Sequence, residues 1–273
     1  MKNMLFSISF WIFIIASFQA FPSEYDRPLY AGSRPLGMGN AYIAVCDDAE
    51  ASFWNPAGII QWQGVKISAS TQVSDRSKGP VDSKCIAYSY RDTGFAWGNK
   101  IALRVNGETP DFNYYSIAYK LNPFFAAGVS LKFKRRHPCE YYQFFGYKTS
   151  YDLGLLWKSE SGRSSGILIQ NLADKKQLVD VITFGLANEW SSFFGRQDRV
   201  LLSMDVSIFP ERHRLLEPHI GWEWKPNSIL SIRAGLSELD LTIGLGLNLS
   251  RIRVDYAWIS DNNRSFLSAS ILL

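Results

Sequence analysis

Three histidines are the side chains in this sequence best suited to moving protons near neutral pH. His137 and His213 stand among arginines in polar segments, which is typical of solvated basic loops. His219 alternates with Glu223, and with Asp205 they form either a proton relay or, as we expect, a structural polar cluster. The chain has no Gly-x-Ser-x-Gly, no His-Glu-x-x-His and no phosphate-binding loop. We therefore expect no enzymatic activity and no cofactor.

The cysteine spacing and the net charge argue against a metal-binding cysteine site and against nucleic-acid binding. Cys46, Cys85 and Cys139 are too widely spaced for a metal-binding pattern, so they are either buried packing residues or, for two of them, a disulfide. A net charge of +4, from 29 basic and 25 acidic residues, is too small and too evenly spread to indicate nucleic-acid binding.

The amino-terminal sequence predicts export. A basic start at Met1 and Lys2 precedes an apolar run from Met4 to Phe18 and then small residues, so residues 1–23 are expected to be a secretory signal peptide. The run is shorter than the roughly 20 residues that a transmembrane helix needs. No later apolar run reaches about 18 residues, which excludes a helical membrane protein.

From residue 64 onward the hydrophobic pattern has a period of two, as in β-strands with one apolar face. Leu241, Ile243 and Leu245, for example, alternate with Thr242 and Gly244. Fourteen strands are predicted in this way. Their ranges are 64–72, 84–91, 95–105, 113–121, 125–135, 148–158, 164–171, 180–191, 199–209, 217–225, 228–236, 240–249, 251–260 and 265–273.

Strand number and length favour an all-β fold, a transmembrane antiparallel β-barrel of about 14 strands, over a soluble sandwich. A tilted membrane-spanning strand needs about 9–11 residues, and single-chain outer-membrane barrels have even strand numbers. If the first strand runs outward, most inner turns are shorter than the outer loops, as such barrels require. The charged residues of the strands should then point into the lumen. They are Lys66, Lys100, Arg104, Lys120, Lys132, Asp152, Asp205, Glu223, Arg233, Arg253 and Asp255.

Residues 30–63 break the two-residue rhythm and carry a recognisable signature. An Arg with small residues is followed by a Met-Gly step, an Ala-Val stretch, an Asp pair and Asn-Pro-Ala-Gly. The block resembles the amino-terminal pattern of FadL-type outer-membrane proteins and their PorV-like relatives. The matching residues are Arg34, Leu36, Gly37, Met38, Gly39, Ala41, Ala44, Val45, Asp47, Asp48, Ala49, Ala51, Trp54, Asn55, Pro56, Ala57 and Gly58. Asn40 and Cys46 depart from it, where Gly and Ala are usual.

The resemblance implies that residues 24–63 form a plug, or hatch, inside a barrel made by residues 64–273. A capping segment that merely seals the barrel floor is the alternative. Asp47 or Asp48 is expected to cap a short helix over residues 49–54, which Pro56 ends. Asn55 should form hydrogen bonds with backbone groups that would otherwise lack partners inside the lumen.

The resemblance also implies a bacterial outer-membrane protein in contact with outer-membrane lipid, and a transporter or channel for hydrophobic small molecules such as long-chain fatty acids. Arg34 is either a partner for a ligand carboxylate or a partner of Asp47 or Asp48. The expected ligand-binding and plug residues are Arg34, Met38, Asp47, Asp48, Asn55, Pro56, Ala57, Phe144, Phe145 and Tyr147. A PorV-like scaffold for secretion-system proteins and a general diffusion pore remain open as alternatives.

Overall fold

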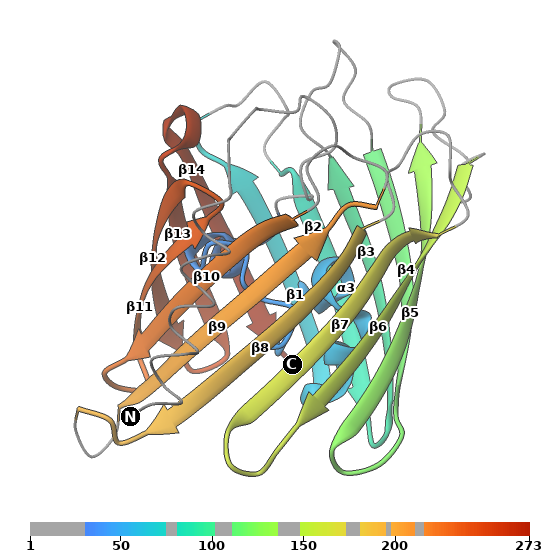
Figure 1. The fold of residues 1–273 in the computed structure, drawn as a ribbon, viewed down its shortest axis with the longest axis horizontal. Helices are drawn as coiled ribbons and strands as arrows, with labels where there is room; N and C mark the ends of the chain where they lie inside the picture. Colours follow the sequence, from blue (N-terminus) through green and yellow to red (C-terminus); the bar gives the residue numbers. More distant parts are fainter. Residues whose placement is uncertain are drawn as a thin grey trace.

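In the computed structural model the chain forms a closed, antiparallel, fourteen-stranded β-barrel (Figure 1). The structure describes residues 31–74, 81–101, 111–135, 148–172, 181–194, 198–210 and 216–273. The strands are β1 (Gly64–Gln72), β2 (Ser83–Tyr90), β3 (Thr93–Ile101), β4 (Asp111–Lys120), β5 (Phe125–Arg135), β6 (Lys148–Lys158), β7 (Arg163–Leu172), β8 (Val181–Ser191), β9 (Arg199–Ile208), β10 (Leu216–Lys225), β11 (Leu230–Ser237), β12 (Asp240–Leu249), β13 (Ile252–Ile259) and β14 (Arg264–Leu272).

All fourteen strands predicted from the alternation are found, and their ends agree with the predictions within two residues. The exception is the predicted end of the third strand at 105, which falls outside the described residues. β1 pairs with β14, in a register that sets Ser68 opposite Ser270, and so closes the barrel. Closure leaves no free strand edge, which is the condition for a sheet to cross a bilayer.

The two faces of the sheet differ as a membrane barrel requires. On β12, Leu241, Ile243, Leu245 and Leu247 are exposed on the outer surface, whereas Thr242 is buried inside. The predicted lumenal charges are confirmed for the side chains that the structure describes; Arg104 lies outside them. The buried ones are Lys100, Lys132, Asp152, Asp205, Glu223, Arg233 and Asp255, and Lys66, Lys120 and Arg253 are partly buried on the same face.

The barrel has a short-turn end and a loop end. Residues 91–92, 121–124, 159–162, 226–229 and 250–251 connect strands at the short-turn end, where β8 also ends at Ser191 and β9 begins at Arg199. At the opposite, loop end β3 ends at Ile101 and β5 ends at Arg135, and the longer connections that follow them, 102–110 and 136–147, fall outside the described residues. A short 3₁₀ turn, η3 (Asp261–Asn263), also lies there.

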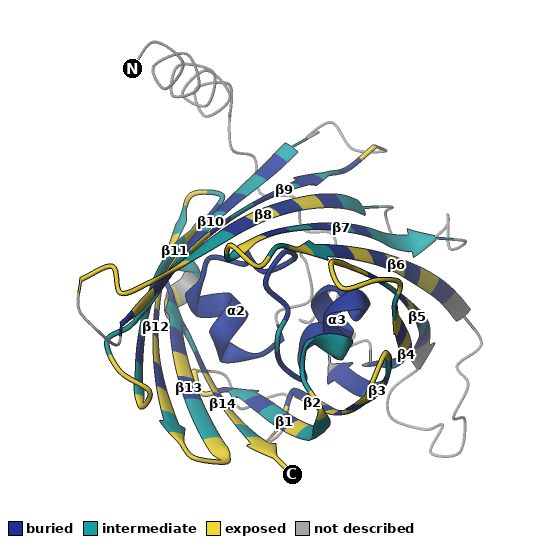
Figure 2. Ribbon diagram, turned by 90° about the horizontal axis from the view of Figure 1, so that it is seen from below, coloured by how far each residue is buried: buried dark blue, intermediate teal, exposed yellow. Residues whose placement is uncertain are grey.

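Residues 31–63, which we call the internal segment, lie inside the barrel. Seen along the barrel in Figure 2, its helices α2 (Ser33–Gly37) and α3 (Ala51–Trp54) are surrounded by the ring of strands. A 3₁₀ helix, η1 (Pro56–Gln61), follows and contacts β2 to β6. Within the described ranges, every helix is too short or too polar to cross a bilayer.

The expected helix cap is wrong. α3 begins at Ala51 rather than at residue 49, its N-cap position is Glu50, and no side chain caps it. Asp47 and Asp48 are turned instead toward Arg34 and Tyr42. An ion pair with a buried guanidinium outweighs a cap, which is worth only about 1 kcal/mol.

Candidate functional site: the anchored internal segment

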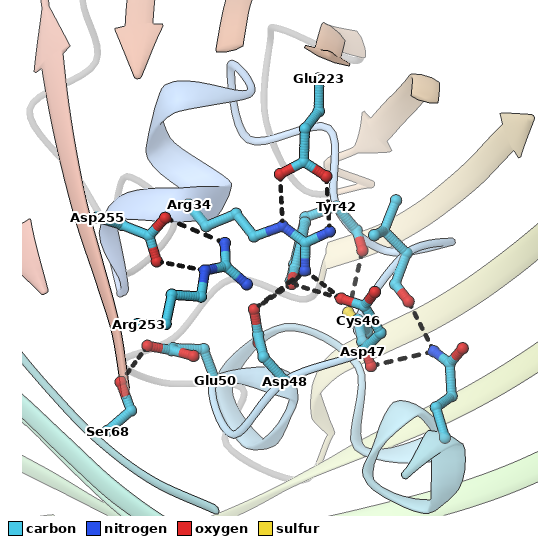
Figure 3. Close-up of polar contacts among 12 residues, drawn as sticks. Arg34, Tyr42, Cys46, Asp47, Asp48, Glu50, Ser68, Glu223, Arg253 and Asp255 are labelled. Atoms are coloured by element: carbon cyan, nitrogen blue, oxygen red, sulfur yellow. Dashed lines mark hydrogen bonds and ion pairs between the residues drawn. The ribbon is translucent and has the colours of Figure 1, made fainter. Parts of the chain in front are cut away.

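Arg34 is the centre of a buried charged cluster that joins the internal segment to the barrel wall (Figure 3). Its Nε and Nη2 donate to the two oxygens of Glu223 on β10, at 3.0 and 2.9 Å. Its Nη1 pairs with Asp47 and, at 3.4 Å, with Asp48. The same nitrogen donates to the Tyr42 hydroxyl at 3.0 Å, and that hydroxyl donates to Asp48. One guanidinium thus binds both the segment's own acids and the wall.

The wall continues the cluster beyond Glu223. Arg233 Nε donates to Glu223 at 2.7 Å, and Lys225 approaches it at 3.0 Å. Arg233 also lies 2.8 Å from Asp255, which pairs at 2.7 Å with Arg253. Charges alternate in sign from the segment through β10 and β11 to β13, so each buried charge has an opposite neighbour, as burial requires.

The cluster fixes the protonation states of its groups in the internal segment. Burial alone would lower the pKa of Arg34, but Asp47 and Glu223 beside it raise that pKa well above its usual value. Burial would raise the pKa of Asp47, yet the nearby Arg34, Lys225 and Lys66 hold it well below its usual range. Both groups therefore stay charged over the physiological pH range.

Two further polar groups hold the backbone of the segment. Asp205 on β9 accepts hydrogen bonds from the backbone N–H groups of Tyr42 and Ile43, at 2.7 and 2.8 Å. Asn55 donates to the carbonyls of Ile43 and Leu155 and accepts from Ala57 N–H. The predicted backbone role of Asn55 is confirmed. These bonds satisfy groups that the barrel shields from water.

Glycines on the lumenal face of the wall make room for this segment. A Cβ built at Gly128 would lie 2.5 Å from Ala57 N, and one at Gly166 would lie 2.5 Å from the Ile43 carbonyl oxygen. The wall glycines that meet the segment in this way are Gly94, Gly98, Gly128, Gly154, Gly166, Gly185, Gly221, Gly235 and Gly244. At most of these positions backbone of the wall packs directly on backbone of the segment, whereas Gly94, Gly98 and Gly154 face side chains of the segment.

A separate contact joins the start of α3 to β1. Glu50 is buried and accepts a hydrogen bond from Ser68. Burial, and then the nearby Asp48, raise the pKa of Glu50 to about 8. Unlike Asp47, Glu50 has no cation bonded to it among the described contacts.

Most of the predicted site residues lie in this assembly. Arg34, Met38, Asp47, Asp48, Asn55, Pro56 and Ala57 all belong to the internal segment, and Met38 packs on Gly221 and Gly235. Of the two roles considered for Arg34, the structure shows pairing with Asp47 and Asp48; its nitrogens are already occupied and not free for a ligand head group. Phe144, Phe145 and Tyr147 fall outside the described residues.

The remaining candidate groups have structural roles where the structure describes them. His219 shares a hydrogen bond with Ser237 at 3.1 Å, and Asp205 is committed to the backbone of the segment. Cys46 and Cys85 are free and buried, so a disulfide between them is excluded. In the described ranges no group of His, Cys, Asp or Glu is arranged to hold a metal.

Sequence reasoning missed Tyr42 and the wall glycines. Nothing in the period-two pattern marks Tyr42, because its partners Arg34 and Asp48 are close only after the segment folds. The glycines did leave a signal. Gly128, Gly154 and Gly244 stand at lumenal positions of otherwise regular strands, where an absent side chain indicates close approach of another backbone.

A scan against protein-family models and a search of curated proteins find no match. Solved structures do match. CymD, a monoaromatic hydrocarbon channel, is 13% identical with a TM-score of 0.59, covering 93% of this chain and 99% of its own. The Pseudomonas putida toluene transporter TodX is 12% identical with a TM-score of 0.59, covering 91% and 99%.

A Pseudomonas aeruginosa FadL homologue is 10% identical, with a TM-score of 0.54, and the match covers 90% of this chain and 99% of the other. The fold is therefore that of FadL-type outer-membrane channels, as the resemblance implied. Two of these neighbours are described as a channel and a transporter.

Proposed function

We propose that this protein is an outer-membrane channel for hydrophobic small molecules, in which the internal segment is the gate. The observation that carries the proposal is the cluster around Arg34. It holds the segment to the barrel wall through a few ion pairs, in addition to the close packing of the segment on the wall glycines. A segment held in this way closes the lumen and yet has discrete contacts that can be broken.

The apolar outer surface supports the same function. Leu241, Ile243 and Leu245 form part of a lipid-facing surface, and hydrophobic solutes partition into the bilayer that such a surface contacts. Neighbours of this fold are described as a toluene transporter and a monoaromatic hydrocarbon channel. We propose long-chain fatty acids as a finer substrate class, on the strength of the motif from Arg34 to Gly58.

Uptake measurements test the proposal. The full chain is expressed in cells that lack their own hydrophobic transporters, and insertion is verified by the heat-dependent electrophoretic mobility of a folded barrel. Uptake of labelled toluene and labelled oleate is then compared with cells carrying an empty vector. We expect faster uptake of both solutes.

The possible results separate the substrate classes. Faster uptake of toluene alone excludes fatty acids as substrates and retains the channel function. Unchanged uptake of both by an inserted barrel removes the channel and favours the PorV-like scaffold, for which recovery of bound secretion-system proteins becomes the next measurement. Uptake of small sugars at the same rate as toluene points to a general diffusion pore.

A further inference from the structure

A cavity of about 290 Å³ opens at the short-turn end of the barrel, beside the internal segment. It lies between the Ala44–Asp47 stretch of the segment and the ends of β6 to β10, next to the turn at Gly162. If the first strand runs outward, as the connection lengths predict, this mouth faces the periplasm. The cavity borders the ion-pair cluster described above, since Arg34, Asp47 and Glu223 are among its lining residues.

The lining of the cavity is rich in cations. Five of its side chains are basic, Arg34, Lys66, Lys158, Arg199 and Lys225, against the acids Asp47, Glu189 and Glu223. Counting these formal charges gives five positive and three negative, a net of two positive.

Two of these cations make only weak contacts with other groups of the protein. Lys158 donates to the neutral amide oxygen of Gln61 at 2.9 Å. Arg199 is 64% exposed and stands 3.8 Å from Glu189, a loose pair. By contrast the negative charge of Glu223 is already paired with Arg233, which does not line the cavity.

The wall of the cavity also has an apolar portion. Val45 and Leu201 line it, together with the indole of Trp62, over which the Lys66 ammonium lies at 4.2 Å from the ring centroid. A ligand there meets several cations together with a smaller apolar surface. That combination matches an amphipathic anion rather than a free inorganic ion or a neutral hydrocarbon.

We propose that this cavity is a binding site for small carboxylates with an apolar body, of about the size of benzoate or a short-chain fatty acid. Its volume sets the size, since an apolar cavity of about 150 Å³ accommodates benzene and 290 Å³ leaves room for a carboxylate and some water. Lys158 and Arg199 bind the carboxylate, and Trp62, Val45 and Leu201 contact the body.

The role of the site in transport rests on the proposed function: it receives the anion at the exit of the channel. Binding itself is independent of transport. It is measured on the purified full chain in detergent by titration calorimetry with three ligands of one shape, benzoate, toluene and benzylammonium. We expect saturable binding of benzoate, weakening as salt rises, and no saturable binding of the other two.

Charge-removing variants locate the site. Lys158→Gln combined with Arg199→Gln is expected to weaken benzoate binding roughly tenfold, since each change removes a charged hydrogen-bond donor. Lys120→Gln is the matched control, because Lys120 is also a lumenal lysine near the short-turn end but does not line the cavity. It should bind benzoate as the unchanged protein does.

Several outcomes overturn the proposal. Benzylammonium binding at least as well as benzoate shows that Asp47 and Glu189 dominate. If inorganic phosphate binds as tightly as benzoate, the apolar residues of the cavity do not contribute to binding. If Lys120→Gln weakens benzoate binding as much as the double variant does, the ligand does not bind in this cavity. Toluene uptake without benzoate binding defeats this site but not the channel. Benzoate binding without any uptake defeats the channel but not the site.

Discussion

Arg34 pairs with three carboxylates, of which Asp48 and Glu223 are buried and Asp47 is partly exposed. Arg34→Met leaves Asp47, Asp48 and Glu223 without this partner, and breaking a buried pair costs roughly 3–5 kcal/mol. We expect the internal segment to detach while the barrel remains folded. Hydrogen exchange of residues 31–63 should accelerate by at least an order of magnitude.

The control for Arg34 is Arg91→Gln. Arg91 is exposed at a short turn and its side chain lies over the Tyr90 ring, so its loss should leave the exchange of the segment unchanged. Equal protection of residues 31–63 in Arg34→Met and the unchanged protein would show that the glycine contacts, not the ion pairs, hold the segment.

Glu50 makes the anchoring dependent on pH. It faces Asp48 in the segment, Ser68 on β1 and Cys85 on β2. An unburied glutamic acid has a pKa near 4.5, whereas that of Glu50 is about 8, so the seated segment keeps a proton that the released segment loses. The free energy by which protonated Glu50 stabilises the seated segment is fully present below pH 4.5 and is lost as the pH rises through about 8.

Protease digestion of the internal segment at a series of pH values checks this dependence. Digestion of the unchanged protein should be faster at pH 8.5 than at pH 5, after correction for the protease's own pH profile. Glu50→Gln, which stays neutral, should flatten the difference between the two. A steep dependence that survives in Glu50→Gln would assign it to another group.

Asn40 explains one departure from the FadL-type pattern. Its φ of 64° lies in the left-handed region, which accounts for the Gly that is usual there; Asn is among the few other residues that adopt it readily. Its side chain also donates to Ser237 on β11 at 3.1 Å. The substitution therefore exchanges backbone freedom for an added contact with the wall.

Among the elements, β5 and β3 differ in how they meet the segment. A Cβ at Gly128 on β5 meets backbone atoms of Pro56 and Ala57 at 2.5 Å, which cannot move without shifting η1. A Cβ at Gly98 on β3 meets the Phe53 ring at 2.6 Å, and a ring can rotate away.

Gly128→Ala is therefore expected to destabilise the seating of the segment by about 1–3 kcal/mol, and Gly98→Ala by less. Proteolysis of residues 31–63 measures the difference, with heat-dependent mobility confirming that both barrels are folded. Similar susceptibility of the two variants would indicate that the segment adjusts as a whole and is not held by local backbone contact.

How much the sequence could predict depended on whether a pattern is local. The strands follow from alternation within each range, so even β12, with its glycines, was placed correctly at 240–249. The cap at Asp47 or Asp48 was wrong because its competitors, Arg34 and Tyr42, act through a fold that local rules do not contain. The link from Arg34 to Glu223 spans 189 positions, and no spacing rule predicts it.

For the whole molecule, the outer surface determines insertion. Leu245, 49% exposed on the outer face of β12, lies midway along its strand. Leu245→Arg should destabilise the barrel in lipid vesicles by roughly 2–4 kcal/mol, as for cations at the bilayer midplane. Urea titration of the vesicle-inserted protein gives the value.

Leu239→Arg serves as its control, since Leu239 is exposed in the turn between β11 and β12, away from the hydrocarbon. Its stability should change by about 1 kcal/mol or less. Equal losses in the two variants would mean that the hydrocarbon boundary lies closer to the loop end than the length of β12 implies.

The wall glycines have a consequence for the speed of permeation. At Gly128, Gly166 and Gly235 wall backbone lies on segment backbone, so under the proposed function a solute passes only after the segment has moved. In a channel of this build the opening event, and not diffusion of the solute, limits the flux. Chemically unrelated solutes should therefore approach one common maximal rate at saturation, and that rate should fall steeply on cooling.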